Sequence, residues 1–368
     1  MGRQHVLAIP YPAQGHVLPL LELMQRLAKH GFKVTFVNTE FTHKRVMNAL
    51  SGKDNIEDHI HLVEDRNEVR KLTESIFHVM PGKLEELIEN INGSGKDKIT
   101  CIVADELLGW ALKMIKLSPT MPAISTTHFV WACIGDLATQ KTFFEVIVKN
   151  NKPVAMADWL ICNSTYELEP AVFTLFPNIM PIGPLLTSNG LGNSAGYFWP
   201  KDSTCLEWLD QQPANSVIYV AFGSFTVFDQ IQFQEFALGL ELTNKPILRM
   251  VGWAPQQKVL GHPSVACFLS HCGWNSTMEG LSNGIPFLCW PYFADQFFNQ
   301  SYICDVWKVE LGFNCDENGI IKQGEIKNIN DKTFKARALD LKEVVSKSAK
   351  EGGCSHNNFN NFIEWMKA

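Results

Sequence analysis

Short apolar runs alternate with longer amphipathic stretches in the first half of the chain. The runs at residues 5–10, 32–37 and 99–104 have the length of buried strands, whereas residues 17–30 and 80–91 repeat apolar side chains at helical spacing. Strands that alternate with helices in this order predict β-α-β units with right-handed crossovers, and therefore a parallel sheet. The fold class that this pattern predicts is α/β.

The same alternation resumes after a break. Residues 187–202 show no periodicity and are rich in glycine, asparagine and serine, which is typical of an interdomain linker. After the break, strands are expected at 217–222, 264–269 and 287–290, and helices at 205–210, 229–242, 297–306, 336–348 and 358–367. We therefore expect a first domain at 1–186, a second domain at 203–350 and a terminal helical segment at 351–368.

Two joins in this pattern are too short for a parallel sheet. A helix that starts at Ala111 breaks off within 113–120, and an apolar strand at 248–249 runs directly into the next motif. A parallel strand needs a crossover of about a dozen residues before its neighbour. Segments are therefore missing at these joins, either as deletions from the polypeptide or as disordered loops left out of the sequence, and we favour the second interpretation.

Composition and charge narrow the class of protein. Of the 368 residues 46% are hydrophobic, which suffices for two cores, and a formal net charge of −6 argues against a nucleic-acid-binding surface. The ten cysteines include no CxxC pair, which favours free thiols in a reducing compartment. No secretory pattern opens the chain, and no apolar run reaches the roughly 18 residues of a membrane-spanning helix. We expect a cytoplasmic monomer without stable membrane insertion, whose sequons at Asn92, Asn163, Asn275 and Asn299 are coincidental.

The most informative stretch joins an expected strand to an expected helix. Residues 271–276 (HCGWNS) follow the strand at once, and Gly273 allows a sharp turn. Asn275 and Ser276 are favourable N-cap residues for the next helix. A strand, a glycine turn and a helix in this order aim backbone N–H groups and a positive helix end at an anion. We expect a phosphate-bearing ligand there; ordinary capping is the alternative role of the two polar residues, and the two roles are compatible.

Residues 253–296 resemble, in length and content, the plant secondary product glycosyltransferase box of the family 1 UDP-glycosyltransferases. The resemblance continues at 15–19 (GHVLP), which is similar to the family's GHxxP, and at 217–224, which is similar to its YVxFGS strand. It covers essentially the whole chain apart from the short joins. It implies the GT-B fold, in which two Rossmann-like domains with parallel sheets face a central cleft and the last helix crosses back onto the first domain.

The resemblance implies a UDP-sugar site in the second domain. Uracil is expected to stack on Trp253, with a backbone hydrogen bond from Ala254. The ribose hydroxyls are expected on Glu279, with Gln256 as a weaker candidate. The residues implied around the diphosphate are Ser224, His271, Gly273, Asn275 and Ser276, with Gly15 as a further donor contact. Fixed donors there stabilise the charge that develops on the β-phosphate as the C1–O bond breaks. Outside such a motif, a core role for Trp253 and a solvated position for Glu279 would be the commoner interpretations.

The end of the box implies the sugar contacts. Asp295 and Gln296 are expected to bind hexose hydroxyls, and Trp274 is expected to contribute mainly by its backbone and shape. Glutamine at position 296 resembles glucose-using members of the family, and an uncharged Trp274 offers no partner for a glucuronate carboxylate. UDP-glucose is therefore the expected co-substrate, and no cofactor is implied. The chain has no DxD motif, so no metal is expected.

The proton chemistry is expected in the first domain. His16 is expected in the loop after the first strand, where open α/β sheets place their ligands, and its ordinary pKa of about 6.5 suits a general base near neutral pH. Asp105 closes the strand at 101–104 and could hold the other imidazole nitrogen. Family positions match both residues, whereas spacing alone would favour structural roles. The residues expected to line the acceptor pocket are Phe77, Phe129 and Trp131.

Together these expectations predict an inverting, metal-independent transfer of glucose from UDP-glucose to a hydroxyl of a small lipophilic metabolite, such as a phenolic, a flavonoid or a terpenoid. The alternative is a non-catalytic module that binds a nucleotide sugar, if the joins near 113–120 and 248–249 are real deletions. The family carries a helix and a donor-contacting strand after Asp105, and 113–120 leaves no room for them. A nicotinamide-dependent Rossmann enzyme would need GxGxxG after a strand, and the chain has none.

Overall fold

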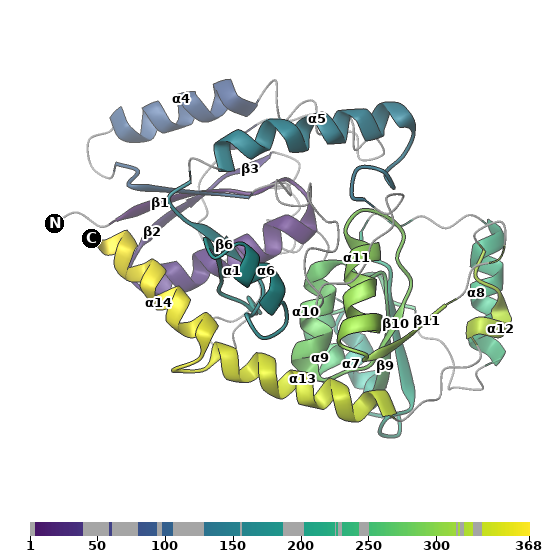
Figure 1. Ribbon diagram of the computed structural model, residues 1–368. Coiled ribbons are helices and arrows are strands. Elements are labelled where there is room, and N and C mark those ends of the chain that lie inside the picture. Colours follow the sequence, from purple (N-terminus) through teal and green to yellow (C-terminus); the bar gives the residue numbers. More distant parts are fainter. Residues whose placement is uncertain are drawn as a thin grey trace.

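The computed structural model contains two α/β units (Figure 1). A cavity is lined by residues of both units. The residues that the structure describes are 4–39, 59–60, 80–93, 98–105, 129–154, 157–186, 202–224, 226, 230–242, 250–313, 316, 320–326 and 333–368. All but the last residue of the expected linker at 187–202 falls outside them. The domain boundaries therefore stay predictions.

The sheet of the first unit is parallel, with the strand order β2-β1-β5. Its strands are β1 (His5–Ile9), β2 (Lys33–Phe36) and β5 (Cys101–Ala104), and α1 (Gln14–Lys29) connects β1 to β2. Val6 lies opposite Val34 on one side and Cys101 on the other. Leu23 and Leu27 of α1 are buried in the core beneath this sheet because helical spacing places them on one face.

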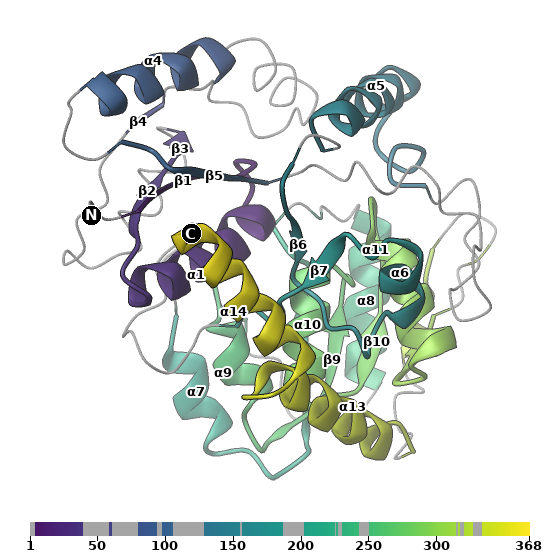
Figure 2. The same cartoon turned by 60° about the vertical axis from the view of Figure 1, so that its left-hand side comes forward.

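Two short strand pairs and three helices complete the described part of the first unit. The strand pairs, both parallel, are β3 (Asn38–Thr39) with β4 (His59–Ile60) and β6 (Leu160–Cys162) with β7 (Ile179–Pro181). The helices are α4 (Met80–Gly93), α5 (Leu137–Val154) and α6 (Pro170–Leu175). The sequence analysis did not predict α5. Helices α4 and α5 lie on the opposite side of the first sheet from α1 (Figures 1 and 2).

The second unit repeats the design with the parallel strand order β11-β10-β9-β8. Its strands are β8 (Val217–Ala221), β9 (Val265–Ser270), β10 (Phe287–Cys289) and β11 (Glu310–Gly312). Its helices are α7 (Thr204–Leu209), α8 (Gln230–Leu242), α9 (Gln256–Leu260), α10 (Trp274–Asn283), α11 (Gln296–Ser301) with a π-helical turn (Tyr302–Val306), α12 (Gln323–Ile326) and α13 (Thr333–Ala349). Within the described parts of the chain, no helix is both long and apolar enough to cross a membrane.

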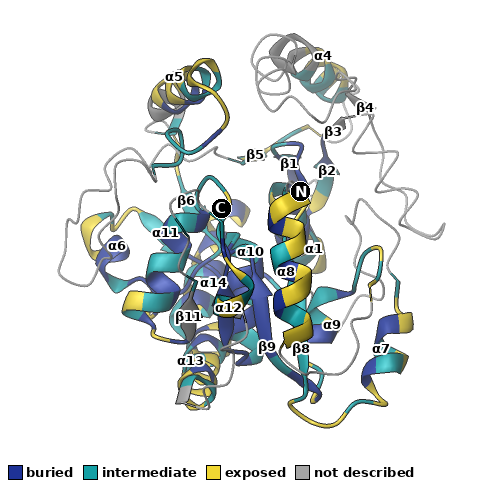
Figure 3. Cartoon of the chain, turned by 90° about the vertical axis from the view of Figure 1, so that its right-hand side faces the viewer, coloured by how far each residue is buried: buried dark blue, intermediate teal, exposed yellow. Residues whose placement is uncertain are grey.

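Strand β9 is the centre of the second unit and is buried on both faces (Figure 3). Phe268 packs into one hydrophobic core and Leu269 into another, because successive side chains of a strand point to opposite faces. Helices cover both faces of such a sheet, so its strands are continuous apolar runs. Both units are thus parallel sheets flanked by helices, and the predicted α/β class is confirmed.

The last helix, α14 (Cys354–Lys367), follows α13 and returns to the first unit, where it lies beside α1 (Figures 1 and 2). Phe359, Phe362, Ile363 and Met366 are buried in the core of the first sheet. The side-chain amide of Asn358 donates to the carbonyl of Pro181 at 2.9 Å. This is the crossing that the GT-B resemblance implies.

Candidate active site

A cavity of about 1630 Å³ lies between the two units. In the first unit its walls come from α1 and from residues after β1 and β5, and in the second they come from residues after β8, β9 and β10. The carboxyl ends of parallel strands therefore face the cavity from both sides, which is where open α/β sheets bind ligands. Every catalytic and donor-binding residue predicted from the sequence lies in its wall. Their individual roles stay predictions.

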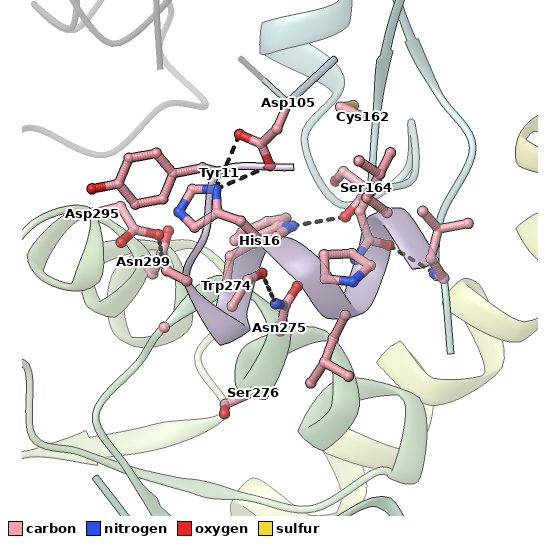
Figure 4. A pocket seen from close by; sticks show the side chains of 18 of the residues that line it. Tyr11, His16, Asp105, Cys162, Ser164, Trp274, Asn275, Ser276, Asp295 and Asn299 are labelled. Carbon is pink, nitrogen blue, oxygen red and sulfur yellow. Dashed lines mark hydrogen bonds and ion pairs between the residues drawn. The ribbon is translucent and has the colours of Figure 1, made fainter. Parts of the chain in front are cut away.

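His16 and Asp105 are hydrogen-bonded to each other in this cavity (Figure 4). Nδ1 of His16 lies 3.1 Å from both carboxylate oxygens of Asp105. The backbone N–H of Asp105 donates to Ile9 of β1 at 2.8 Å, so the sheet holds the carboxylate in place. A carboxylate at Nδ1 selects the tautomer whose Nε2 can accept a proton. Burial lowers the pKa of His16, but the charge and hydrogen bond of Asp105 and the charge of Asp295 outweigh this, so the pKa lies above its ordinary 6.5.

The first helix begins earlier than the sequence analysis expected, and His16 lies in its first turn instead of in a loop. α1 starts at Gln14 and has Pro19 inside it. Proline has no backbone N–H, so the carbonyl of Gly15, four residues earlier, receives no helical hydrogen bond from it. The side-chain amide of Asn275, from the second unit, donates to that carbonyl. The prediction of a loop at His16 was therefore wrong.

The turn between β9 and α10 lies where the anion site is expected, but its N-cap residue differs from the prediction. Cys272, and not Gly273, has the left-handed conformation, with φ of 65°, and Gly273 is the N-cap residue. Asn275 and Ser276 lie in the first turn of α10, so the N-cap prediction for them was wrong. Their side chains are used elsewhere: Asn275 reaches across the cavity, and the hydroxyl of Ser276 accepts from Gln256 at 2.9 Å. The first N–H groups of α10 have no intrahelical acceptor and suit a phosphate.

His271 lies beside this turn as a neutral imidazole. Burial lowers the pKa of His271 to about 4, and a hydrogen bond with Ala221 only partly opposes the shift. Nε2 is enclosed by two glycines, since a Cβ at Gly223 would lie 2.6 Å from it and one at Gly273 would lie 2.5 Å from it. A neutral imidazole in this place can offer an N–H to a phosphate without adding positive charge.

Two glutamines hold the carboxylate of Glu279, the predicted ribose acceptor. Its Oε2 accepts from Gln256 at 2.6 Å, and its Oε1 accepts from Gln257 at 2.9 Å. Gln256 in turn accepts from the hydroxyl of Tyr219 at 3.1 Å. Both glutamines belong to α9, which starts three positions after Trp253, so one short helix orders the expected ribose and uracil contacts together. The sequence analysis missed Tyr219 and Gln257.

Asp295 and Gln296, the predicted sugar contacts, precede and begin α11. Oδ2 of Asp295 accepts from the side-chain amide of Asn299 at 2.8 Å. Oε1 of Gln296 accepts from the backbone N–H groups of Tyr292 and Phe293 at 2.7 and 3.0 Å, so its Nε2 is the atom left for a sugar hydroxyl. Burial raises the pKa of Asp295, whereas the hydrogen bond from Asn299 opposes the shift.

Two tryptophans of the second unit donate hydrogen bonds to backbone carbonyls of the first unit. The indole N–H of Trp274 donates to the carbonyl of Asn163 at 2.7 Å, and that of Trp307 donates to the carbonyl of Leu168 at 3.0 Å. Both carbonyls belong to the segment between β6 and α6. We call residues 271–276, where a phosphate is expected, the phosphate turn. The side chain of Trp274 therefore joins the phosphate turn to the first unit, in addition to its predicted backbone contribution.

The three expected acceptor residues have different positions. Phe129 lines the cavity. Trp131 stacks on Phe129, with ring centroids 4.8 Å apart, and does not itself line the cavity that the described residues form. Phe77 lies outside the described residues. The sequence analysis missed Tyr11, whose ring centroid lies 5.1 Å from that of His16. It also missed three apolar residues of the wall: Ile134, Phe143 and Ile147.

One buried carboxylate in the wall has no part in the predicted chemistry. Glu169 precedes α6, and its Oε2 accepts from the hydroxyl of Ser164 at 2.5 Å. Burial raises the pKa of Glu169 to about 7, although the hydrogen bond from Ser164 opposes the shift. In the folded protein Glu169 is therefore protonated over a range of pH in which the unfolded chain has already ionised.

The Glu169→Gln variant is expected to be more stable than the wild type at alkaline pH. Because the folded-state pKa of about 7 exceeds the unfolded value of 4.5, the wild type loses stability as pH rises between these values, in total about 3 kcal/mol. Glutamine can accept the same hydrogen bond and has no proton to lose. Denaturant unfolding at about pH 5 and about pH 8.5 checks this, with Glu167→Gln, at an exposed position, as the control. Equal stability differences at both pH values would contradict the assignment.

Comparisons with known proteins identify the family of the chain. The family described as UDP-glucoronosyl and UDP-glucosyl transferase matches residues 239–346. UDP-glycosyltransferase 83A1 of Arabidopsis thaliana is 42% identical over 453 aligned positions, which cover 100% of this chain and 98% of the relative. Mogroside I-E synthase of Siraitia grosvenorii is 28% identical, with 100% and 99% covered. Since 453 positions exceed the 368 residues of this chain, the Arabidopsis relative carries internal segments that the chain lacks, in agreement with the short joins.

Solved structures share the fold. Os79 from O. sativa in complex with UDP matches with a TM-score of 0.82 at 22% identity, covering 98% of this chain and 100% of that one. Phytolacca americana UGT2, complexed with UDP-2fluoro-glucose and pterostilbene, matches with a TM-score of 0.77 at 22% identity, covering 99% and 100%. The fold is therefore GT-B, as predicted. With 42% identity to a plant UDP-glycosyltransferase along its whole length, the chain belongs to the plant family 1 UDP-glycosyltransferases and is a UDP-dependent glycosyltransferase.

Proposed function

We propose that the protein is an inverting, metal-independent glucosyltransferase that moves glucose from UDP-glucose to a hydroxyl of a small lipophilic metabolite. The observation that carries the proposal is that the His16–Asp105 pair and the N-terminus of α10 line one cavity. A base and an anion site across one cavity are what a single displacement at C1 requires.

The reaction follows from the positions of these groups. Nε2 of His16 takes the proton of the acceptor hydroxyl, the oxygen bonds to C1 of glucose, and the bond from C1 to the β-phosphate oxygen breaks. UDP leaves with that electron pair, and its charge is stabilised by the N–H groups of α10 and by His271. Asp105 stabilises the imidazolium until the proton passes to solvent. Attack opposite the leaving group inverts the configuration at C1.

The choice of donor and of mechanism has separate support. Gln296 ends the box as it does in glucose-using members, and one relative is named 7-deoxyloganetic acid glucosyltransferase, from Catharanthus roseus. The leaving group meets helix N–H groups, which can replace a metal ion.

The acceptor class and the cellular setting are part of the same proposal. Phe129, Ile134, Phe143 and Ile147 give the cavity an apolar wall, which suits phenolic, flavonoid or terpenoid alcohols. Free cysteines spread through both units suit the reducing cytoplasm. We expect a monomer, which size-exclusion chromatography with light scattering checks.

Incubation of the protein with UDP-glucose, UDP-galactose or UDP-glucuronate and a panel of such alcohols tests the function. We expect a β-linked glucoside with UDP-glucose, identified by mass and by the anomeric proton coupling, at the same rate with and without EDTA. The alternative is a module that binds a nucleotide sugar without transferring it, which requires that the internal segments carried by the Arabidopsis relative are real deletions from this chain. That alternative predicts calorimetric binding of UDP-glucose and no product from any acceptor.

A further inference from the structure

Asn299 connects two parts of the donor site and lies outside the box at 253–296. It is 4% exposed and belongs to α11. Its Nδ2 donates to Oδ2 of Asp295 at 2.8 Å and to the backbone carbonyl of Cys272 at 2.8 Å. Figure 4 shows Asn299 beside Asp295 in the cavity. A side-chain amide nitrogen has two hydrogens, so both bonds can form at once.

The two groups that Asn299 contacts belong to different binding elements. Cys272 is the fully buried left-handed residue of the phosphate turn, and its N–H donates to the hydroxyl of Ser270 at 3.1 Å. Its carbonyl also accepts from the hydroxyl of Thr277 at 3.4 Å, which holds the turn onto α10. Asp295 is the carboxylate proposed for the sugar. Asn299 thus joins the phosphate turn to the sugar carboxylate through one amide group.

We propose that Asn299 is a positioning residue for glycosyl transfer, which holds Asp295 at a fixed distance from the phosphate turn. The inference rests on the proposed function, in which the diphosphate lies at that turn and the hexose at Asp295. The phosphate turn fixes one end of the glucosyl phosphate and Asp295 fixes the other. The place of C1 relative to Nε2 of His16 therefore depends on the spacing that Asn299 sets.

The environment of Asp295 supports this role. Rotation of an aspartate side chain is free unless a partner holds one of its oxygens, and Asn299 holds Oδ2. Oδ1 is then the oxygen aimed at a sugar hydroxyl. Burial raises the pKa of Asp295, and the hydrogen bond from Asn299 lowers it, so the same amide favours the charged acceptor. A carboxylate is the better acceptor for a hydroxyl because charge-assisted hydrogen bonds are stronger.

Two substitutions at position 299 separate hydrogen bonding from packing. Asn299→Asp keeps the size and shape of the side chain, but its ionised form cannot donate, and it sets a second carboxyl group against Asp295. Even when protonated it has one O–H, so it cannot donate to Asp295 and to Cys272 at once. Asn299→Ala removes the donor and leaves a small void. Misplacement of reacting groups by about 1 Å can cost on the order of 100-fold, so we expect both variants to lose about 30-fold to 100-fold in kcat/KM for UDP-glucose. We expect the aspartate variant to be at least as impaired as the alanine variant.

A packing role predicts the reverse order, with the aspartate variant near wild type, and that result would overturn the proposal. Gln300→Ala is the matched control, because Gln300 is the next residue of α11 and does not line the cavity that the described residues form. Gln300 is half-buried and away from the cavity wall, so the variant should stay within about twofold of the wild type. Thermal unfolding of each variant shows that it is folded. The aspartate variant retains the side-chain volume, so it still decides the question if the alanine void lowers the melting temperature.

A double-mutant cycle with Asp295 tests whether Asn299 acts through that carboxylate. In the Asp295→Ala background we expect Asn299→Ala to cost less than about threefold further, since residues acting through one contact are not additive. UDP, which has no sugar, should bind to Asn299→Ala within about threefold of the wild type. Fully additive losses in the cycle would overturn the proposal. The same double-mutant cycle can be measured with calorimetric affinities for UDP-glucose, which require no transfer. If the wild type transferred no glucose, the proposed function would be contradicted, but the coupling between Asn299 and Asp295 could still be measured.

Discussion

The His16→Ala variant is expected to lose about 1000-fold in kcat for glucosyl transfer, because a positioned general base contributes on the order of 100-fold to 10,000-fold. Its affinity for UDP-glucose should stay within about threefold of the wild type, since in the proposed reaction His16 contacts the acceptor proton and not the nucleotide. Kinetics with a saturating acceptor and calorimetry with UDP-glucose measure the two quantities. Full transfer activity in the variant would show that another group is the base.

A second histidine–carboxylate pair offers a matched control for this prediction. Nε2 of His262 lies 3.1 Å from Asp210, and neither residue lines the cavity that the described residues form. His262→Ala should therefore leave kcat unchanged.

The wild-type pH profile adds a check on the same base: burial lowers the pKa of His16, but Asp105 and Asp295 raise it more. The protonated form cannot accept a proton, so kcat/KM should rise with pH around a midpoint above 6.5.

The Gly273→Ala variant is expected to bind UDP about 10-fold to 100-fold more weakly, since overpacking of a well-packed site typically costs about 1–3 kcal/mol. The new Cβ would lie 2.5 Å from Nε2 of His271. The ring has little room to move away, because Gly223, which follows β8, lies close to the same atom. Gly273 has a φ of −60°, which alanine adopts freely, so the effect would come from crowding and not from backbone strain.

Gly252→Ala provides the control for this substitution. Gly252 lines the same cavity, and a Cβ there would have no atom within 4 Å. The affinity of the Gly252→Ala variant for UDP, measured by calorimetry, should stay within about threefold of the wild type. Unchanged UDP affinity in Gly273→Ala would mean that the diphosphate does not use this turn.

Some elements were predictable from sequence because one local signal determines them. Strands β9 and β10 coincide closely with the predicted apolar runs, since strands buried on both faces contain few polar residues. The half-buried β8 is also an uninterrupted apolar run and coincides with its prediction. Helix α5 was not predicted, because its buried Phe143 and Ile147 alternate with the exposed Phe144 and Val148, which weakens the helical period. The predicted start of α1 was wrong because the local sequence does not reveal the hydrogen bond that Asn275 of the second unit donates to the carbonyl of Gly15.

For the site, too, only the residues that share one local motif could be predicted from the sequence. Residues 253–296 are contiguous, so a motif could indicate them together, and the structure brings them to one cavity. Tyr219 and Gln256 meet only because β8 lies beside the helix after Trp253, and no spacing rule relates them. The contact between Trp274 and Asn163 joins residues 111 positions apart. Contacts that the fold creates between distant segments therefore required the structure.

The position of α14 in the chain has a consequence for biosynthesis. Its buried residues, Phe359, Phe362, Ile363 and Met366, complete the core of the first sheet, yet the ribosome makes them after the entire second unit. Until then, the nascent first unit exposes the apolar surface of α1 that this helix covers. Exposed apolar surface of this kind attracts chaperones and favours misassembly during synthesis. The unit that leaves the ribosome first is thus the one that finishes folding last.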